Sequence, residues 1–317
     1  MITVNNKFHI PNQWEELSPA QFSKVVRALR LWEMGEITDF LGFKLAVLYA
    51  LMDEGVKAHP ENEIFCENLF RLSEHITFPY RFVYPDEKFQ NFPAHIQEYL
   101  TKHMPADFED PFIRMAARME RYILPDLHFA KQMIPELPGT KLQGYSFSVL
   151  ADVVNTTLTA QQYIDANTVL QQYHSSKNEE FLYSLVRILY CPTPYSPDKA
   201  EKISLKKVGE GYRYAVMYNY MAITDWIASL PKYDILFHAP SKKDGKNPLG
   251  PNAPLYNLSG KGYGTLNEVG AMPLFSYLDL LLKQTVDAVL QLQSIGKKKG
   301  EICKELNLTV EQINTIL

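Results

Sequence analysis

The sequence predicts a mainly α-helical protein that contains two similar helical hairpins. Apolar residues recur three and four positions apart through much of the chain, which is the period of an amphipathic helix. In addition, the segment 17–49 resembles the segment 158–190, which lies 141 residues later, without any gap. A small N-terminal β-hairpin, minor extended segments and a C-terminal helical tail complete the predicted fold.

The N-terminus is predicted to form the β-hairpin. In "ITVNNKFHI" apolar and polar residues alternate around Asn5 and Asn6, and Asn tolerates the positive φ of a tight turn. The first helical hairpin follows. Ser18 is a favourable N-cap for its first helix, and Gly35 indicates where that helix ends. The second helix is expected over residues 38–52.

The second helical hairpin is predicted from an internal repeat. An offset of 141 residues aligns Ser18 with Thr159, Gln21 with Gln162, and "FLGFKLAVLY" with "FLYSLVRILY". Seven of the 33 aligned positions are identical, and the cap residue, the helix length and the polar turn correspond. This indicates that a helix–turn–helix unit is used twice. The expected buried equivalents are Phe40 with Phe181 and Leu48 with Leu189.

The domain boundaries are predicted from Pro and Gly. An aromatic-rich and Pro-rich segment, 76–92, follows the first hairpin and is expected to be partly extended. The run "IPELPGTKLQG" (134–144) is typical of a linker. The expected parts are a first helical half with the β-hairpin (1–134), a second helical half (145–237), a flexible loop (238–264), and a long helix over 273–293 within a C-terminal helical region (265–317).

The predicted loop, 238–264, is rich in Gly and Pro and has few apolar residues, so it is expected to stay on the surface. It contains "SGKGYG", whose Gly and Lys are reminiscent of a phosphate-binding loop. The run lacks the spacing of a P-loop and the strand and helix that flank one. We therefore interpret it as a flexible loop.

Composition and charge narrow the class of protein. The net charge is -4, which argues against a general nucleic-acid or anionic-membrane surface. Cys66, Cys191 and Cys303 are isolated from one another, which indicates free thiols rather than a disulfide framework or a zinc site. The sequence shows neither a signal peptide nor an apolar run of about 20 residues. We expect a soluble cytoplasmic protein.

The sequence contains no recognisable catalytic grouping. H-E-x-x-H and G-x-S-x-G are absent, and the eight histidines are scattered singly. Acidic residues do not cluster with the spacing of metal ligands. We therefore expect no enzyme activity, no cofactor and no metal.

The C-terminal "GEICKELNLTVEQINTIL" has helix-turn-helix spacing, with Asn307 at the turn and Thr309 as the cap of the second helix. DNA-binding proteins place such a second helix in the major groove. The possible nucleic-acid contacts are Lys297, Lys298, Lys299 and Gln312. The acidic Glu311 and the lack of an arginine for guanine favour a packing or partner-binding tail instead. A DNA-associated regulator is the alternative function.

Three segments resemble phage proteins. "IPNQWEELSPAQF" resembles the N-terminus of phage tail-assembly chaperones. "LTAQQYIDANTVLQQY" and "EEFLYSLVRILYCP" are similar to uncharacterised proteins encoded in prophage and tail-like clusters of Bacteroidetes. The matching positions are Pro11, Trp14, Leu17, Gln21, Phe22, Gln162, Tyr163, Phe181, Leu182 and Tyr190. The chain departs from the chaperone pattern in its length and in using the helical unit twice.

The resemblance implies a non-enzymatic assembly protein that binds another protein of a phage or phage-tail-like particle, as a chaperone or a structural accessory. Exposed aromatic side chains commonly anchor such contacts. The candidate partner-binding residues are Tyr256 and Tyr263 of the predicted loop and Tyr80, Phe82 and Tyr84 of the aromatic segment.

Overall fold

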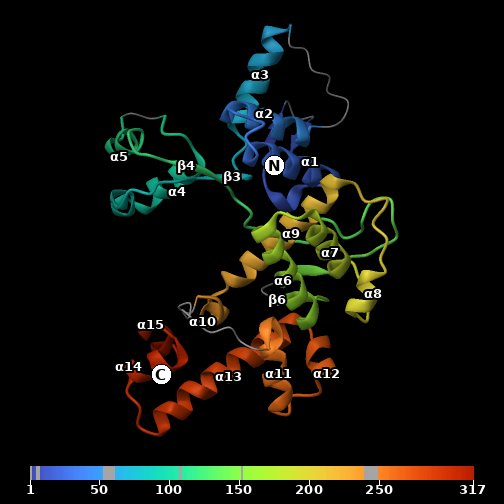
Figure 1. Cartoon of the computed structure of the whole chain (residues 1–317). Coiled ribbons are helices and arrows are strands. Elements are labelled where there is room, and N and C mark those ends of the chain that lie inside the picture. Colours follow the sequence, from blue (N-terminus) through green and yellow to red (C-terminus); the bar gives the residue numbers. More distant parts are fainter. Residues whose placement is uncertain (1, 5–7, 53–60, 107–108, 151–152, 239–248) are drawn as a thin grey trace. The chain divides into compact units, whose positions relative to one another are not determined.

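The protein is mainly helical, as predicted (Figure 1). A computed structural model describes residues 2–4, 8–52, 61–106, 109–150, 153–238 and 249–317. The chain divides into two compact units, Met1–Phe129 and Ala130–Leu317. The predicted second half and C-terminal region therefore belong to one unit.

Unit 1 begins with strands and continues with helices. Its elements are β1 (Ile2–Val4), β2 (Phe8–Ile10), the 3₁₀ turn η1 (Trp14–Glu16), α1 (Pro19–Glu33), α2 (Phe40–Leu51), α3 (Glu63–Glu74), β3 (Tyr80–Val83), η2 (Glu87–Asn91), α4 (Ala94–Lys102), α5 (Pro111–Ala116) and β4 (Tyr122–Pro125). β1 pairs with β2 and β3 with β4, both antiparallel. The predicted N-terminal hairpin is thus confirmed, while its expected turn at Asn5 and Asn6 lies outside the described residues.

Unit 2 also begins with a β-hairpin and continues with helices. Its elements are β5 (Phe147–Leu150), β6 (Val153–Thr156), α6 (Ala160–Ser176), α7 (Glu179–Leu189), α8 (Pro197–Glu201), α9 (Glu210–Ala228), η3 (Pro231–Tyr233), α10 (Asp234–Phe237), η4 (Gly250–Asn252), α11 (Ala253–Gly260), α12 (Leu266–Ala271), α13 (Leu274–Ser294), α14 (Lys299–Leu306) and α15 (Val310–Asn314). β5 and β6 form an antiparallel pair that the sequence reasoning missed.

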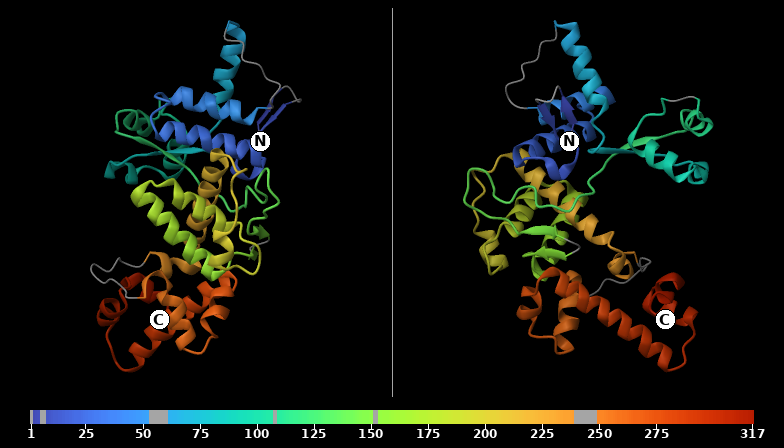
Figure 2. Two further views of the ribbon diagram at one scale, coloured as in Figure 1. Left: turned by 45° about the vertical axis from the view of Figure 1, so that its right-hand side comes forward. Right: turned by 180° about the vertical axis from the view of Figure 1, so that it is seen from behind.

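Both helical hairpins start with the same cap. Ser18 caps α1 and Thr159 caps α6, each through a capping box with the glutamine three residues later, Gln21 or Gln162. Figure 2 shows α1 beside α2 (blue) and α6 beside α7 (green), and each pair packs closely. The paired helices and the order β-hairpin, capped helix, second helix recur in both units.

The capping glutamines also join the two helices of each hairpin. The Gln21 Nε2 donates to the Leu51 carbonyl (2.8 Å), and the Gln162 Nε2 donates to the Ile188 carbonyl (3.1 Å). In both hairpins the start of the first helix is therefore hydrogen-bonded to the end of the second. One residue thus satisfies groups at two helix termini, which otherwise lack partners.

The predicted buried equivalents are confirmed in part. Leu48 and Leu189 are 0% and 1% exposed, whereas Phe40 and Phe181 are both only half-buried. Tyr49 and Tyr190 align in sequence but differ in the structure. Tyr49 is 38% exposed, while Tyr190 is buried and its hydroxyl donates to the Ile134 carbonyl (2.5 Å).

The predicted linker, 134–144, is a compact turn within unit 2. Ile134 and Leu137 are fully buried, and the Leu137 N–H donates to the Leu142 carbonyl (3.0 Å). Gly139 adopts φ +75, which glycine tolerates without strain. The Pro and Gly residues therefore mark a reversal of the chain rather than a boundary between parts.

The prediction of a flexible loop over 238–264 is wrong for the second half of that range. Residues 250–260 form η4 and α11, and the part over 239–248 lies outside the described residues. Pro254 stands in the first turn of α11, where its missing N–H has no cost. Leu255 and Leu258 are 0% exposed, so the segment does bury apolar side chains.

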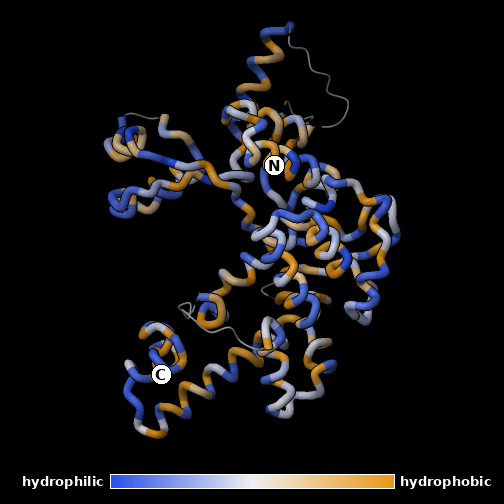
Figure 3. The backbone as a smooth tube through the Cα atoms, in the orientation of Figure 1, coloured by the Kyte–Doolittle hydropathy of each residue, from blue (hydrophilic) through white to orange (hydrophobic). Residues whose placement is uncertain are grey.

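The C-terminal tail folds onto the end of α13 as a small core. The two short helices α14 and α15 meet at Asn307, whose left-handed φ of 57 ends α14, and Thr309 caps α15, as predicted. The buried members of this core are Ile235, Val289, Ile302, Leu308 and Ile313. Figure 3 shows hydrophobic positions alternating with hydrophilic ones along these helices.

Candidate protein-binding arm

An insertion in unit 1 forms what we call the arm, residues 80–125, which starts with β3 and ends with β4. It carries α4 and α5 away from the α1–α2 hairpin (Figures 1 and 2). β3 and β4 pair in the register Tyr80 with Pro125 and Val83 with Tyr122. The two ends of the insertion are therefore brought together at one point of the unit.

One face of the β3–β4 ribbon packs against α2. Tyr80 and Phe82 are 3% and 2% exposed, and their rings lie 4.8 Å and 5.5 Å from the ring of Phe40. Phe43 adds a further contact to Tyr80 at 6.3 Å. Each such aromatic pair contributes about 0.5–1.5 kcal/mol beyond its buried area. The contacts fix the base of the arm to the helical hairpin.

A row of aromatic rings fills the interior of the arm. Tyr84 stacks on Phe89 with ring centroids 4.4 Å apart, and Phe89 lies 5.3 Å from Phe92. Phe92 in turn contacts Phe112 of α5 at 5.2 Å. Burial raises the pKa of the Tyr84 hydroxyl, which stays protonated at neutral pH. The interior thus joins β3, η2 and α5 into one packed body.

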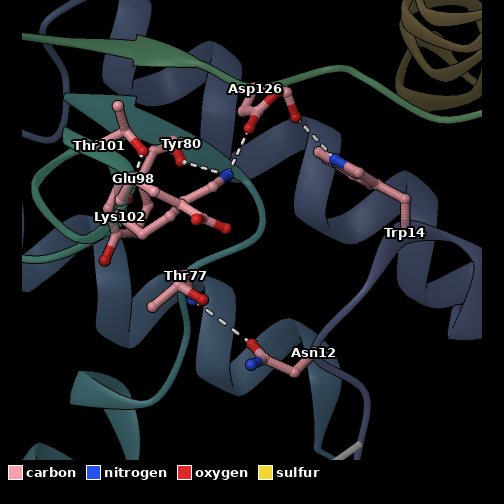
Figure 4. Close-up of polar contacts among 8 residues, drawn as sticks. All are labelled: Asn12, Trp14, Thr77, Tyr80, Glu98, Thr101, Lys102 and Asp126. Atoms are coloured by element: carbon pink, nitrogen blue, oxygen red, sulfur yellow. Dashed lines mark hydrogen bonds and ion pairs between the residues drawn. The ribbon is translucent and has the colours of Figure 1, made fainter. Parts of the chain in front are cut away.

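Polar contacts hold together the two ends of the arm, which we call its root (Figure 4). The Trp14 indole Nε1 donates to the Asp126 carbonyl (2.7 Å), and the Asp126 N–H donates to the Pro79 carbonyl (3.2 Å). The Lys102 ammonium forms an ion pair with the Asp126 carboxylate and donates to the Tyr80 carbonyl (3.4 Å). Groups from η1, from α4 and from Pro79, the residue before β3, therefore meet at Asp126.

The Trp14 ring lies in a second aromatic cluster at this root. It is 3% exposed, and its centroid lies 5.6 Å from Phe22, 4.9 Å from Phe78 and 5.2 Å from Phe129. Trp14 and Phe22 both belong to this cluster. In this chain they help to hold the arm.

The arm exposes apolar side chains on its surface. We call five of them the outer residues: Tyr99 (38% exposed), Met104 (44%), Met115 (45%), Tyr122 (50%) and Leu124 (42%). Tyr122 and Leu124 lie on β4, opposite Val83 and Arg81 of β3. This side of the ribbon faces away from the one that packs on α2, since neighbouring strand residues point to opposite faces.

Basic side chains surround the outer residue Met115. A shallow hollow of about 500 Å³ at this end of the arm is lined by Met115, Lys88, Arg114 and Arg118, with acidic Glu120 among its other residues. Methionine adapts its shape to different partners, and arginine is enriched at protein interfaces. The lining thus combines two methionines with three basic side chains and two acidic ones, Asp86 and Glu120.

The predicted partner-binding residues have different locations. Tyr80, Phe82 and Tyr84 are not available as surface contacts, because Tyr80 and Phe82 pack against α2 and Tyr84 packs inside the arm. Tyr256 is 46% exposed on α11, and Tyr263, which follows α11, is half-buried. Of the five predicted residues, Tyr256 is the one that is exposed.

Three of the four possible nucleic-acid contacts bond to other residues of unit 2. Gln312 is 5% exposed, and its side chain donates to the Asp234 carbonyl (3.4 Å), so the prediction that it meets bases is wrong. Lys297 forms an ion pair with Glu305, and the Lys299 ammonium donates to the Asn314 side chain (2.7 Å). Lys298 is exposed.

Three further indications of function are missing from the described residues and from known proteins: a metal site, a membrane-spanning helix and a similar protein. Within the described ranges, no three His, Cys, Asp or Glu side chains gather as metal ligands would. In the same part of the chain, no helix combines the length and the apolar character that crossing a bilayer needs. Comparisons with protein-family models, with curated proteins and with solved structures found no match.

Proposed function

We propose that this protein is a non-enzymatic assembly protein of a phage or phage-tail-like particle, and that it binds another protein through the outer residues of its arm. The observation that carries the proposal is the exposure of five large apolar side chains on one insertion. Exposed apolar groups rimmed by polar residues mark interaction sites. In this proposal the protein acts in the bacterial cytoplasm.

The construction of the arm supports a binding role. Its aromatic interior and the contacts at Asp126 order the arm without a partner. A surface that is already ordered loses less conformational entropy when it binds. Tyr122 supplies a rigid aromatic anchor and Met115 an adaptable contact, which are two residue types enriched at interfaces.

The phage assignment rests on the sequence resemblance. The residues that carry it include Trp14 and Phe22, which pack together at the root of the arm (ring centroids 5.6 Å apart). The resemblance and the proposed binding surface therefore involve the same region of unit 1. The alternative, a DNA-associated regulator, lacks comparable support because Gln312 is buried.

The test is co-purification with the products of the neighbouring genes. The tagged full-length protein is co-expressed with each of them, and Leu124→Asp is compared with Leu290→Asp. Leu124 and Leu290 are 42% and 45% exposed, so the control places the same charge at a similarly exposed leucine of α13. We expect a complex that L124D loses and L290D keeps. Equal recovery with both variants would show that the arm does not bind the partner.

A further inference from the structure

Unit 2 contains a cavity that the proposed role of the arm does not use. It lies between α6, α7 and the segment 195–201, and its volume is about 290 Å³. Val169, Ile188 and Ala200 supply apolar walls, while Asp165 and Arg187 supply opposite charges. Small-molecule sites are commonly apolar cavities with a few placed polar groups, and their volumes start at about 300 Å³. The cavity therefore suits a ligand about the size of one amino acid.

The Asp165 carboxylate is half-buried and held by neutral donors. The Tyr195 hydroxyl donates to its Oδ2 (2.6 Å), and the Gln161 Nε2 donates to its Oδ1 (2.8 Å). Burial and this hydrogen bond both raise the pKa of Tyr195, which stays a donor. Asp165 has no ion pair with any described residue. Each oxygen retains a lone pair that can accept from a nitrogen of a ligand.

The Arg187 guanidinium is fixed at one edge only. Its Nε donates to the Ile203 carbonyl (3.1 Å), which orients the planar group. Its two Nη groups have no hydrogen-bond partner among the residues that the structure describes. A guanidinium with its Nη groups unoccupied is suited to a bidentate contact with a carboxylate.

The two hairpins differ at the position of Ser184, which lines the cavity. At the offset of 141 residues, Ser184 of α7 aligns with Phe43 of α2. Phe43 is 1% exposed and fills its site with a ring that contacts Trp32 at 5.4 Å. Ser184 is much smaller, and its hydroxyl donates to the Glu180 carbonyl of its own helix (3.0 Å). The cavity wall therefore carries a small side chain at the position where α2 carries a ring.

The charges of the cavity also differ between the two copies. Asp165 aligns with Lys24, and Arg187 aligns with Ala46. The second copy thus has a carboxylate, a guanidinium and a small hydroxyl side chain where the first has a lysine, an alanine and a phenylalanine. Packing of the hairpin alone does not require this combination, since the first copy packs without it.

We propose that this cavity binds an α-carboxylate whose carbon also carries a nitrogen donor and a short apolar side chain. The carboxylate meets the Nη groups of Arg187, the nitrogen donates to Asp165, and the apolar side chain lies against Val169, Ile188 and Ala200. A free apolar amino acid and the C-terminal residue of a peptide share this chemistry. The exposed Glu201 at the cavity is solvated, so it opposes the carboxylate only weakly.

The test is titration calorimetry of the full-length protein with L-leucine, N-acetyl-L-leucine and L-leucinamide. We expect a Kd below about 1 mM for leucine or for N-acetylleucine. Leucinamide, which lacks the carboxylate, is expected to bind at least about 10-fold more weakly. Tighter binding of leucine indicates a free amino acid, and tighter binding of N-acetylleucine indicates a peptide C-terminus. Absence of binding by both, or equal binding of leucinamide, would overturn the proposal.

Two variants locate the binding. Arg187→Gln is expected to weaken the carboxylate ligands at least about 10-fold and to leave leucinamide unchanged. Ser184→Phe restores the ring of the first copy and is expected to abolish binding. Ser175→Phe, at an exposed position of α6, is the control and is expected to bind normally. Unchanged affinity in R187Q, which alters only a half-buried side chain, would refute the site even if S184F does not fold.

Discussion

Replacing Trp14 by Phe tests how the arm is held to unit 1. The change keeps an aromatic ring among Phe22, Phe78 and Phe129 but removes the indole N–H that donates to the Asp126 carbonyl (2.7 Å). Leaving a part-buried acceptor without its donor costs about 1–3 kcal/mol. The smaller ring also reduces packing, and that loss has to be separated from the loss of the hydrogen bond.

Trp32→Phe supplies the matched control. The Trp32 ring contacts Phe40 and Phe43, and its indole nitrogen has no hydrogen bond to a described residue. We expect urea unfolding to show that W14F loses about 1–3 kcal/mol more stability than W32F. Hydrogen exchange of the amides of residues 80–125 should become faster in W14F only. Equal stability of the two variants, with unchanged exchange in the arm, would refute the role assigned to Asp126 and Trp14.

Three further predictions concern packing, capping and pH. Leu48→Ala and Leu189→Ala should each cost about 2–5 kcal/mol in urea unfolding, because both side chains are fully buried, whereas the exposed Leu290→Ala should cost under about 0.5 kcal/mol. Thr159→Ala should cost about 0.5–2 kcal/mol by the same assay, because it removes the cap of α6, and an unchanged midpoint would contradict that role. Burial, with a smaller effect of Lys102, lowers the pKa of His103 below 6.5, so the unfolded chain binds the proton more readily. Stability should therefore fall as the pH drops through about 6.5, and His103→Gln should reduce this fall; an identical pH profile would contradict it.

The helices could be predicted because their signals are local. Ser18 and Thr159 each start a helix through a side chain that bonds three residues ahead, and Asn307 ends one through its own backbone conformation. The repeat was visible for the same reason, since caps and apolar spacing lie within each hairpin. Such features depend on neighbours in sequence, so one sequence suffices to find them.

The candidate site depended on contacts between distant residues. Tyr80 and Phe82 face inward because β3 pairs with β4 more than forty residues later and packs on α2, which no local pattern in 76–92 reveals. The aromatic and proline content of 76–92 predicted a partly extended segment, but not which side chains are buried. Tyr122 and Leu124 were not predicted as exposed, because all four residues of β4 (Tyr-Ile-Leu-Pro) are apolar and give no alternating pattern.

Two predictions that relied on Gly and Pro residues, a flexible loop and a linker, were wrong. Pro254 and its neighbours indicated a loop, yet Pro in the first turn is compatible with a helix, and Leu255 and Leu258 supply its buried face. The segment 134–144 indicated a linker, yet Ile134 and Leu137 anchor it in unit 2. In both segments the burial of two apolar side chains stabilises an ordered conformation, which outweighs the local preference of Gly and Pro for an irregular backbone.

Photo-crosslinking in cells that produce the particle shows whether the arm contacts a particle protein. A photoreactive phenylalanine analogue replaces Tyr122 on β4 in one variant and Tyr256 on α11 in another, two tyrosines that are 50% and 46% exposed. The proposed function predicts a covalent adduct with one particle protein from position 122 and none from position 256. An adduct from position 256 alone, or from neither position while the particle assembles normally, would contradict it.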